Sequence, residues 1–155
     1  MKIDGKNIGT LRSSELDIKT STCHISNSKI KILDFDLFES DSEIIIDNCI
    51  IEKLLFHSYW PKGGLIFNNN KVLSYVDYQM GGHNEQPIKI SNNTFEEFVN
   101  FFDCQFEAKV EVCNNIFLKG TNLLGNEGEG FQNSFDNGII TENNKGLINL
   151  DGFGD

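Results

Sequence analysis

Aromatic and histidine side chains gather in two short stretches, residues 57–64 and 79–87, that interrupt an otherwise regular sequence. Together they hold the only tryptophan, two of the three histidines and both prolines of the 155-residue chain. Tyr59, Trp60 and Tyr78 could stack on a sugar face or anchor a protein partner, because aromatic side chains dominate the energy of such contacts. We therefore predict a binding edge made of His57, Tyr59, Trp60, Tyr78 and His83.

A purely structural role competes with this interpretation. Trp60 could cover the apolar edge of the neighbouring chain segment, while Pro61 and Gly63 would only shape the turn. If the edge does bind a ligand, a protein partner is the first choice, and a homo-oligomer is possible. The alternative is a carbohydrate-binding or polysaccharide-cleaving domain that uses 57–64 and 79–87.

Acid–base catalysis would need titratable groups held close together. The pairs that the sequence offers are Asp34 with Asp36, and Asp77 near His83. Surface carboxylates that keep strands in solution explain these acids more simply. The chain has no glycine-rich phosphate loop, no serine-centred catalytic motif and no Cys-x-x-Cys pair. We expect a non-enzymatic protein without catalytic residues, metal or cofactor.

The charge of the chain limits the kinds of partner that it is expected to bind. It carries 23 acidic against 13 basic residues, a net charge of −10, and Arg12 is its only arginine. Binding to nucleic acid is not expected, because that needs clustered lysine and arginine, and basic partners are favoured instead. An acidic solenoid that mimics DNA is a more remote option.

The apolar segments and the cysteines of the chain bear on the compartment in which the protein is found. No apolar run approaches the length of a membrane span, and the first ten residues lack the apolar stretch of a secretory signal. The four cysteines are widely spaced, as in a protein with buried reduced thiols: Cys23, Cys49, Cys104 and Cys113. We therefore expect a cytoplasmic protein without membrane contact.

A hydrophobic frame recurs about every eleven residues, in steps of 10 to 12, and two frames make a repeat of roughly 22. The frame opens at Ile44, Leu55, Leu65, Val76, Ile88, Val99, Val110 and Thr121. Apolar residues first alternate, as in 88–90 and 110–112, which indicates a strand with one buried face. Alternation then breaks at an asparagine, a residue that tolerates a left-handed corner. Such regularity predicts a solenoid of stacked turns.

One asparagine returns at the same place in each repeat, in steps of 21 to 23 residues. The six are Asn27, Asn48, Asn69, Asn92, Asn114 and Asn137. Stacked turns would bring these amides about 4.8 Å apart, so that each can bond the next in a ladder. Phe95, Phe106 and Phe117, with Ile51 and Val72, would form the matching apolar columns.

The frames Ile88–Phe95 and Val110–Phe117 resemble the right-handed parallel β-helices of pectate-lyase-like proteins, in which Asn-Asn-x-Phe corners recur. The resemblance covers residues 16–140 and implies an all-β, right-handed parallel β-helix of about six coils with an asparagine ladder. It implies no activity, because Gly81-Gly82-His83 matches the family's catalytic pattern only loosely and no coil holds an arginine.

Two other repeat folds fit less well. A leucine-rich repeat has one strand in each unit, whereas strand-like frames open here every half repeat. The five-residue phasing of a pentapeptide solenoid fails in 57–64 and 79–87. We therefore expect one β-helix domain over 1–155. In it, 1–15 form an N-terminal cap or irregular first coil, 16–140 the coils, and 141–155 a C-terminal cap or tail.

Overall fold

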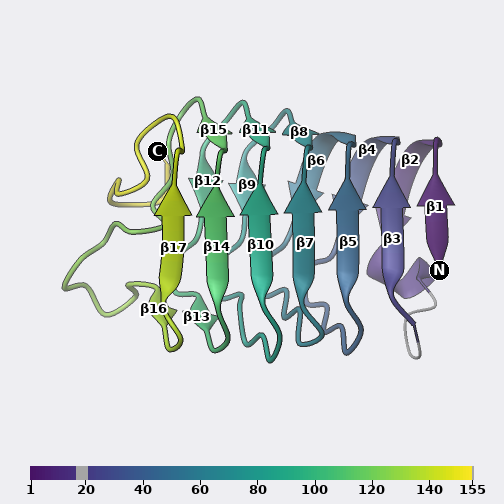
Figure 1. Ribbon diagram of the computed structural model, residues 1–155. Helices are drawn as coiled ribbons and strands as arrows, with labels where there is room; N and C mark the ends of the chain where they lie inside the picture. The colour runs from purple at the N-terminus through teal and green to yellow at the C-terminus, as the bar shows by residue number, and fades with distance from the viewer. Residues whose placement is uncertain (17–20, 155) are drawn as a thin grey trace.

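The computed structural model describes residues 1–16 and 21–154. The chain is an all-β parallel solenoid, as the sequence predicts, with 43% of its residues in strands. Figure 1 shows one sheet rising at the front, the chain crossing at the top and a second sheet descending behind. Each turn is displaced toward the C-terminal end, which makes the coil right-handed. No helix among the described residues is long and apolar enough to cross a membrane.

The front sheet contains seven parallel strands, one from each level of the solenoid. They are β1 (Lys2–Asp4), β3 (Cys23–Ser26), β5 (Ile44–Asp47), β7 (Leu65–Asn68), β10 (Ile88–Ser91), β14 (Val110–Cys113) and β17 (Ile139–Glu142). Cys23 pairs with Ile44 and Ile44 with Leu65, so successive levels are in strict register. The buried alternate side chains of these strands form one wall of the core.

The back sheet consists of strands that follow the front ones after a corner; the first three have six residues each and the later ones two. They are β2 (Asn7–Arg12), β4 (Lys29–Asp34), β6 (Ile50–Leu55), β8 (Lys71–Val72), β9 (Val76–Asp77), β11 (Thr94–Phe95), β12 (Val99–Asn100) and β15 (Ile116–Phe117). Elsewhere, β13 (Gln105–Phe106) pairs with β16 (Ser134–Phe135), and η1 (Ser13–Glu15) is a short 3-10 helix.

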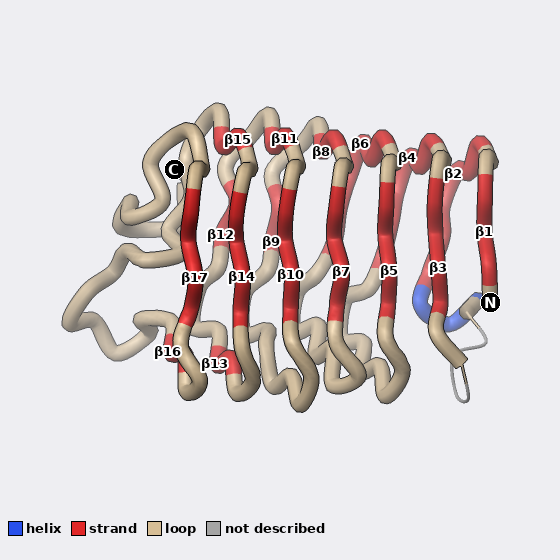
Figure 2. The backbone as a smooth tube through the Cα atoms, viewed as in Figure 1, coloured by secondary structure: helices blue, strands red, loops and turns tan. Residues whose placement is uncertain are grey.

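The loop side, as we call it, returns the chain from the back sheet to the front sheet. It comprises residues 35–43, 56–64, 78–87 and 101–109. Figure 2 shows it as a band of tan loops along the lower edge of the solenoid, where the sheets are red. The two sheets repeat almost identically from level to level, so this side is where the levels differ most.

Left-handed asparagines make the corner between the sheets, which confirms the break in alternation as a turn. Asn27, Asn48, Asn69, Asn92 and Asn114 have φ between +52° and +59°. Their side chains are exposed, and some bond along the axis, as when Asn48 Nδ2 donates to Asn27 Oδ1 at 2.8 Å. The predicted residues are therefore right for the corner and wrong for the buried ladder.

The buried ladder lies one residue later. Asn70, Asn93 and Asn115 are at most 2% exposed. The backbone N–H of Asn70 donates to Asn93 Oδ1 at 2.8 Å, and that of Asn93 donates to Asn115 Oδ1 at 3.0 Å. The side-chain amide of Asn93 also donates to the Phe67 carbonyl at 2.8 Å. Each ladder amide thus satisfies backbone groups that a corner would otherwise leave unpaired in the core.

The predicted column of Ile51, Val72, Phe95 and Phe117 is confirmed, but the frame at Leu55 is displaced by one residue and Phe106 lies in another column. Leu54, not Leu55, pairs in the buried column with Leu33 and Val76, because Leu55 lies opposite Asp77. Phe95 stacks on Phe117 with ring centroids 5.1 Å apart. Phe106 instead stacks on Phe135 at 5.3 Å, in a separate column on the loop side.

The solenoid makes about five regular turns, slightly fewer than the six expected, before a longer last one. Levels are 21 to 23 residues apart until Val110, which pairs with Ile139 across 29 residues. Because this level is longer, the prediction for Asn137 is wrong. Asn137 precedes β17 and is not part of the corner column. Asn143, with φ of 55°, follows β17 at the equivalent corner.

The two ends differ. Within the segment expected as a cap or irregular coil, β1 and β2 pair with β3 and β4, so they continue both sheets. At the other end, Lys145 pairs with Ile116 as a last partial level. Residues 151–154 then fold back over the solenoid, where Phe153 contacts Phe102 and Phe131.

Candidate functional site

Two of the predicted binding residues belong to the core of the loop side. Tyr59 is 0% and Tyr78 2% exposed. The Tyr59 hydroxyl lies 3.2 Å from Ser40 Oγ, and burial raises the pKa of both phenols above their usual value. Their rings pack against Phe56, which lies between the two levels. Neither ring can stack on a ligand, so this part of the predicted edge is wrong.

Trp60 and His83 do meet at the surface, as the spacing of their loops indicates. Their ring centroids are 4.5 Å apart, and the indole N–H of Trp60 donates to the Met80 carbonyl at 3.1 Å. His83 Nδ1 lies 2.9 Å from Glu107 Oε1 on the next level. These contacts hold Trp60 in one orientation while its side chain remains half-buried. We call Trp60, Met80, His83 and Glu107 the Trp60 edge.

Close approaches between levels explain why glycines flank the residues of the Trp60 edge. Gly82 has φ of 95°, and a Cβ there would lie 2.3 Å from the Gln105 carbonyl oxygen. A Cβ on Gly63 would lie 2.4 Å from the Asp41 carbonyl oxygen. Only glycine fits such positions. The glycines therefore let neighbouring loops pack backbone to backbone, which fixes where Trp60 and His83 lie.

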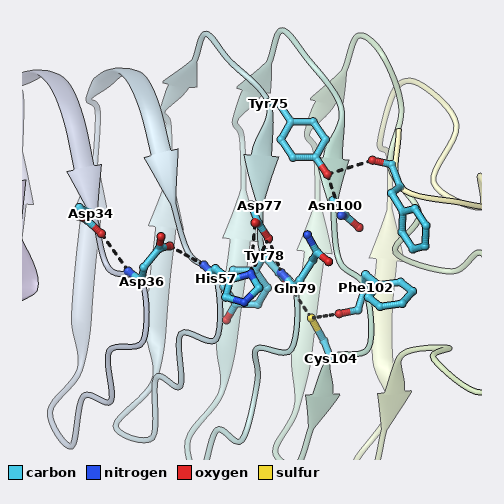
Figure 3. Close-up of polar contacts among 11 residues, drawn as sticks. Asp34, Asp36, His57, Tyr75, Asp77, Tyr78, Gln79, Asn100, Phe102 and Cys104 are labelled. Atoms are coloured by element: carbon cyan, nitrogen blue, oxygen red, sulfur yellow. Dashed lines mark hydrogen bonds and ion pairs between the residues drawn. The ribbon is translucent and has the colours of Figure 1, made fainter. Parts of the chain in front are cut away.

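A second cluster runs along the border of the back sheet and the loop side (Figure 3). Asp36 Oδ1 accepts the backbone N–H of His57 at 2.8 Å. His57 Nδ1 lies 3.2 and 3.3 Å from the two carboxylate oxygens of Asp77. Asp34 Oδ1 accepts the backbone N–H of Asp36 at 3.2 Å. We call Asp34, Asp36, His57 and Asp77 the Asp–His cluster.

Electrostatics set one carboxylate of this cluster apart. Burial raises the pKa of Asp36 above its usual 3.8, and the nearby Asp34 and Asp77 carboxylates raise it further. The N–H of His57 opposes these effects by stabilising the charged form. Asp36 thus carries its charge at some cost, and a positively charged group from outside would relieve that cost.

The predicted acid–base pairs are only partly assembled. Asp34 and Asp36 are neighbours, but Asp77 pairs with His57, whereas His83 pairs with Glu107. In the described residues, no hydrogen bond joins His57 to a serine, threonine or cysteine side chain that could act as a nucleophile. No group of three or more metal-ligating side chains there could hold a metal ion. A fixed histidine with a carboxylate can exchange a proton, but these contacts assemble no further catalytic group.

Sequence reasoning missed the exposed apolar residues of the loop side. Leu37 is 78% and Met80 43% exposed. Both have positive φ, 56° and 51°, in the second corner column that also contains Ser58 and Asp103. At these two corners the left-handed backbone leaves an apolar side chain exposed. The available signal was the break in alternation in 99–106, repeated at 33–40.

Charge surrounds these apolar points. With Asp34 and Asp77 at its border, the loop side holds nine acidic residues and only two lysines. One of these lysines, Lys62, forms an ion pair with Glu39. The loop side therefore carries most of the chain's excess negative charge.

Comparison of the chain with family models, with curated proteins and with solved structures found no match.

Proposed function

We propose that this protein is a non-enzymatic scaffold whose loop side binds another protein. The observation that carries the proposal is an acidic surface with three apolar points. Leu37 and Met80 are exposed, and Trp60 is fixed by its hydrogen bond to the Met80 carbonyl and by its contact with His83. Apolar anchors inside a polar rim are the usual anatomy of a protein interface.

Rigidity supports the same proposal. The N–H of Leu37 donates to the His57 carbonyl at 2.8 Å, that of Ser58 to Gln79 at 2.7 Å and that of Met80 to Phe102 at 2.8 Å. The corners that expose these residues are therefore bonded from level to level. A partner would lose little free energy in ordering such a surface.

Carbohydrate binding, the alternative, has less support. It relied on three aromatic rings, and two of them, Tyr59 and Tyr78, are in the core. A single half-buried indole offers little area for stacking on a sugar chain. Protein binding needs no row of rings, because a few anchors in an acidic rim suffice.

We further propose that the solenoid is of the pectate-lyase-like type and that the protein is cytoplasmic. The left-handed Asn92 corner followed by the buried Asn93 supports the first point. Cys23, Cys49 and Cys104 are buried and reduced, which suits a reducing compartment.

A peptide selection tests the protein-binding proposal. Random dodecapeptides displayed on phage are selected on the wild-type chain, and the affinities of enriched peptides are measured on variants. Trp60→Ala and Leu37→Ser should each weaken binding at least tenfold, because each removes an anchor. Leu118→Ser is the matched control, since Leu118 is 61% exposed but follows β15, outside the loop side.

Two results would contradict the proposal. The enriched peptides could bind the Trp60 and Leu37 variants as tightly as the wild type. Alternatively, a glycan array run in parallel could give the only binding that depends on Trp60, which would restore the carbohydrate alternative.

A further inference from the structure

The last residues of the chain occupy a built site at the end of the border that carries the Asp–His cluster. Residues 151–154 cross back over the levels that contain Asn122, Asn100 and Tyr75. Asn100 and Asn122 are 0% exposed although they extend the outward column of Asp77. Asp77 itself keeps 29% of its side chain exposed. The tail is therefore what covers these two amides.

Recognition of the tail begins at its backbone. The N–H of Gly152 donates to Asn126 Oδ1 at 2.7 Å, and Asn122 Nδ2 donates to the Gly152 carbonyl at 2.8 Å. Asp151 also positions Asn126, because its Oδ1 accepts the Asn126 N–H at 2.7 Å. Both backbone polar groups of Gly152 are thus bound by two asparagine side chains. Such contacts bind the backbone and involve no particular side chain of the tail.

A relay of hydrogen bonds continues to the next residue of the tail (Figure 3). Asn122 Nδ2 donates to Asn100 Oδ1 at 2.8 Å, and Asn100 Nδ2 donates to the Tyr75 hydroxyl at 2.7 Å. Tyr75 in turn donates to the Phe153 carbonyl at 3.0 Å. Three levels of the solenoid therefore supply one continuous polar track for a peptide backbone.

Side-chain selectivity comes from an aromatic contact and a tight glycine. The ring of Phe153 lies 4.6 Å from that of Phe102, edge to face, and 6.1 Å from that of Phe131. A Cβ on Gly154 would lie 2.3 Å from Phe98 Cδ1. The site therefore selects an aromatic residue followed by glycine. Gly152, with φ of 79°, favours glycine before it as well.

We propose that this site, which we call the tail groove, accepts a Gly–aromatic–Gly segment of a protein partner in competition with residues 151–154. The tail groove consists of Tyr75, Phe98, Phe102, Asn122, Asn126 and Phe131. This inference rests on the proposed protein-binding function and adds to it the chemistry of one partner segment. The chain's own tail, seated on the groove, is the evidence for what fits there.

The tail is suited to being displaced. Phe153 remains 41% and Tyr75 39% exposed, so the docked ring keeps close to half its surface in water. An open hollow lined by Glu97, Phe98, Lys119 and the tail itself runs beside residues 150–154. A partner segment that reached Glu97 and Lys119 in this hollow would gain contacts in addition to those of residues 151–154.

The test measures binding of a fluorescein-labelled Asp-Gly-Phe-Gly-Asp peptide to the full-length Phe153→Ala chain. Removing the Phe153 ring weakens the internal competitor without touching the groove. The peptide should bind Phe153→Ala at least tenfold more tightly than the wild type, by fluorescence anisotropy. Tyr75→Phe, added to Phe153→Ala, should weaken binding several-fold, because it removes the donor to the peptide carbonyl. Thermal unfolding of each variant verifies that it is folded.

The matched control peptide replaces the second glycine with alanine. It should bind at least tenfold more weakly, because its methyl group would overlap the Phe98 ring. Equal binding of both peptides, or no gain in Phe153→Ala over the wild type, would overturn the proposal. Sedimentation of the wild type showing a dimer that the peptide dissociates would assign the groove to a second copy, and so overturn the partner assignment.

The two proposals fail separately. Loss of peptide selectivity at the tail groove leaves the Trp60-dependent selection untouched. Enriched dodecapeptides that ignore Trp60→Ala would remove the loop-side proposal, and the anisotropy experiment would still report whether the groove is specific.

Discussion

The corner between the two sheets and the loop side both carry the chain from one sheet to the other, but they do so in opposite ways. At the corner, the levels from Asn27 onward use a left-handed asparagine, and Asn70, Asn93 and Asn115 lie buried next to it. On the loop side, the levels use different residues, and close packing depends on glycines such as Gly63 and Gly82. Repetition at the corner satisfies buried backbone groups with one recurring amide. Variation on the loop side places Trp60, His57 and the carboxylates at defined points.

This difference distinguishes residues that stabilise the stack from residues that are available for binding. A residue that recurs at successive levels forms the same contacts at each of them, so it stabilises the stack. A residue that occurs at one level can form a contact that no other level repeats, as Trp60 does with Met80 and His83. The predictions below ask whether stability and binding separate along this line.

The largest effect is expected for Gly82→Ala on the loop side. The new methyl group would overlap the Gln105 carbonyl, and φ of 95° is strained for alanine. We expect a loss of about 4 kcal/mol in the free energy of unfolding, measured in urea. Gly9→Ala is the control, because its Cβ would have no neighbour within 4 Å. Equal stability of the two variants would mean that the loops do not pack so closely.

Asn93→Ala should come next and tests the corner. It leaves the Asn70 N–H and the Phe67 carbonyl without their partner, whereas Asn115 Oδ1 keeps only the backbone N–H of residue 93. We expect a loss of about 3 kcal/mol by urea unfolding. Asn92→Gly, one residue earlier, keeps the left-handed φ of 57° and should cost only a few tenths of a kcal/mol. The reverse order would place the ladder at the exposed asparagines.

Tyr59→Phe should have a smaller effect, because it removes one hydrogen bond in the loop-side core. The Ser40 hydroxyl, 3.2 Å away, would lose its partner in a fully buried site. We expect a loss of about 1 kcal/mol in thermal or urea unfolding. The double variant with Ser40→Ala should cost less than the two single variants together. Strict additivity would show that the bond contributes nothing.

Asp36→Asn should change stability least, and in a pH-dependent way. The folded-state pKa of Asp36 is raised, so the folded state holds more protons, and stability falls as pH rises from about 3.8 through that pKa. Asparagine still accepts the His57 N–H but carries no charge. The variant should gain a few tenths of a kcal/mol at pH 7 and nothing at pH 3. A gain at pH 3 alone would contradict the cause given for the raised pKa.

Sequence alone predicts the fold well because the repeat of roughly 22 residues is visible in the pattern of apolar residues and asparagines. Strand pairs every half repeat, left-handed corners and apolar columns all follow from residues such as Ile88, Asn92 and Phe95. The ladder was misplaced by one residue because Asn92 and Asn93 are identical in type and differ only in which side of the corner they face. The turn of 29 residues hid the equivalence of Asn114 and Asn143.

The candidate site was harder to predict because burial decides it. Trp60 and His83 were found by composition, and their contact confirms the prediction that the two loops are neighbours. Tyr59 and Tyr78 looked the same in sequence but turn inward. Leu37 and Met80 look like core residues until the left-handed corner turns them out. The pairing of His57 with Asp77 depends on which levels are adjacent, not on sequence distance.

The most direct test measures two quantities in two variants, the free energy of unfolding and the affinity for one dodecapeptide selected on the wild type. Asn93→Ala should lose about 3 kcal/mol of stability and keep its affinity at a temperature where it is folded. Trp60→Ala should lose at least tenfold in affinity and at most about 1 kcal/mol of stability, because its side chain is only half-buried. If either variant lost both properties together, the separation of a folding corner from a binding side would be contradicted.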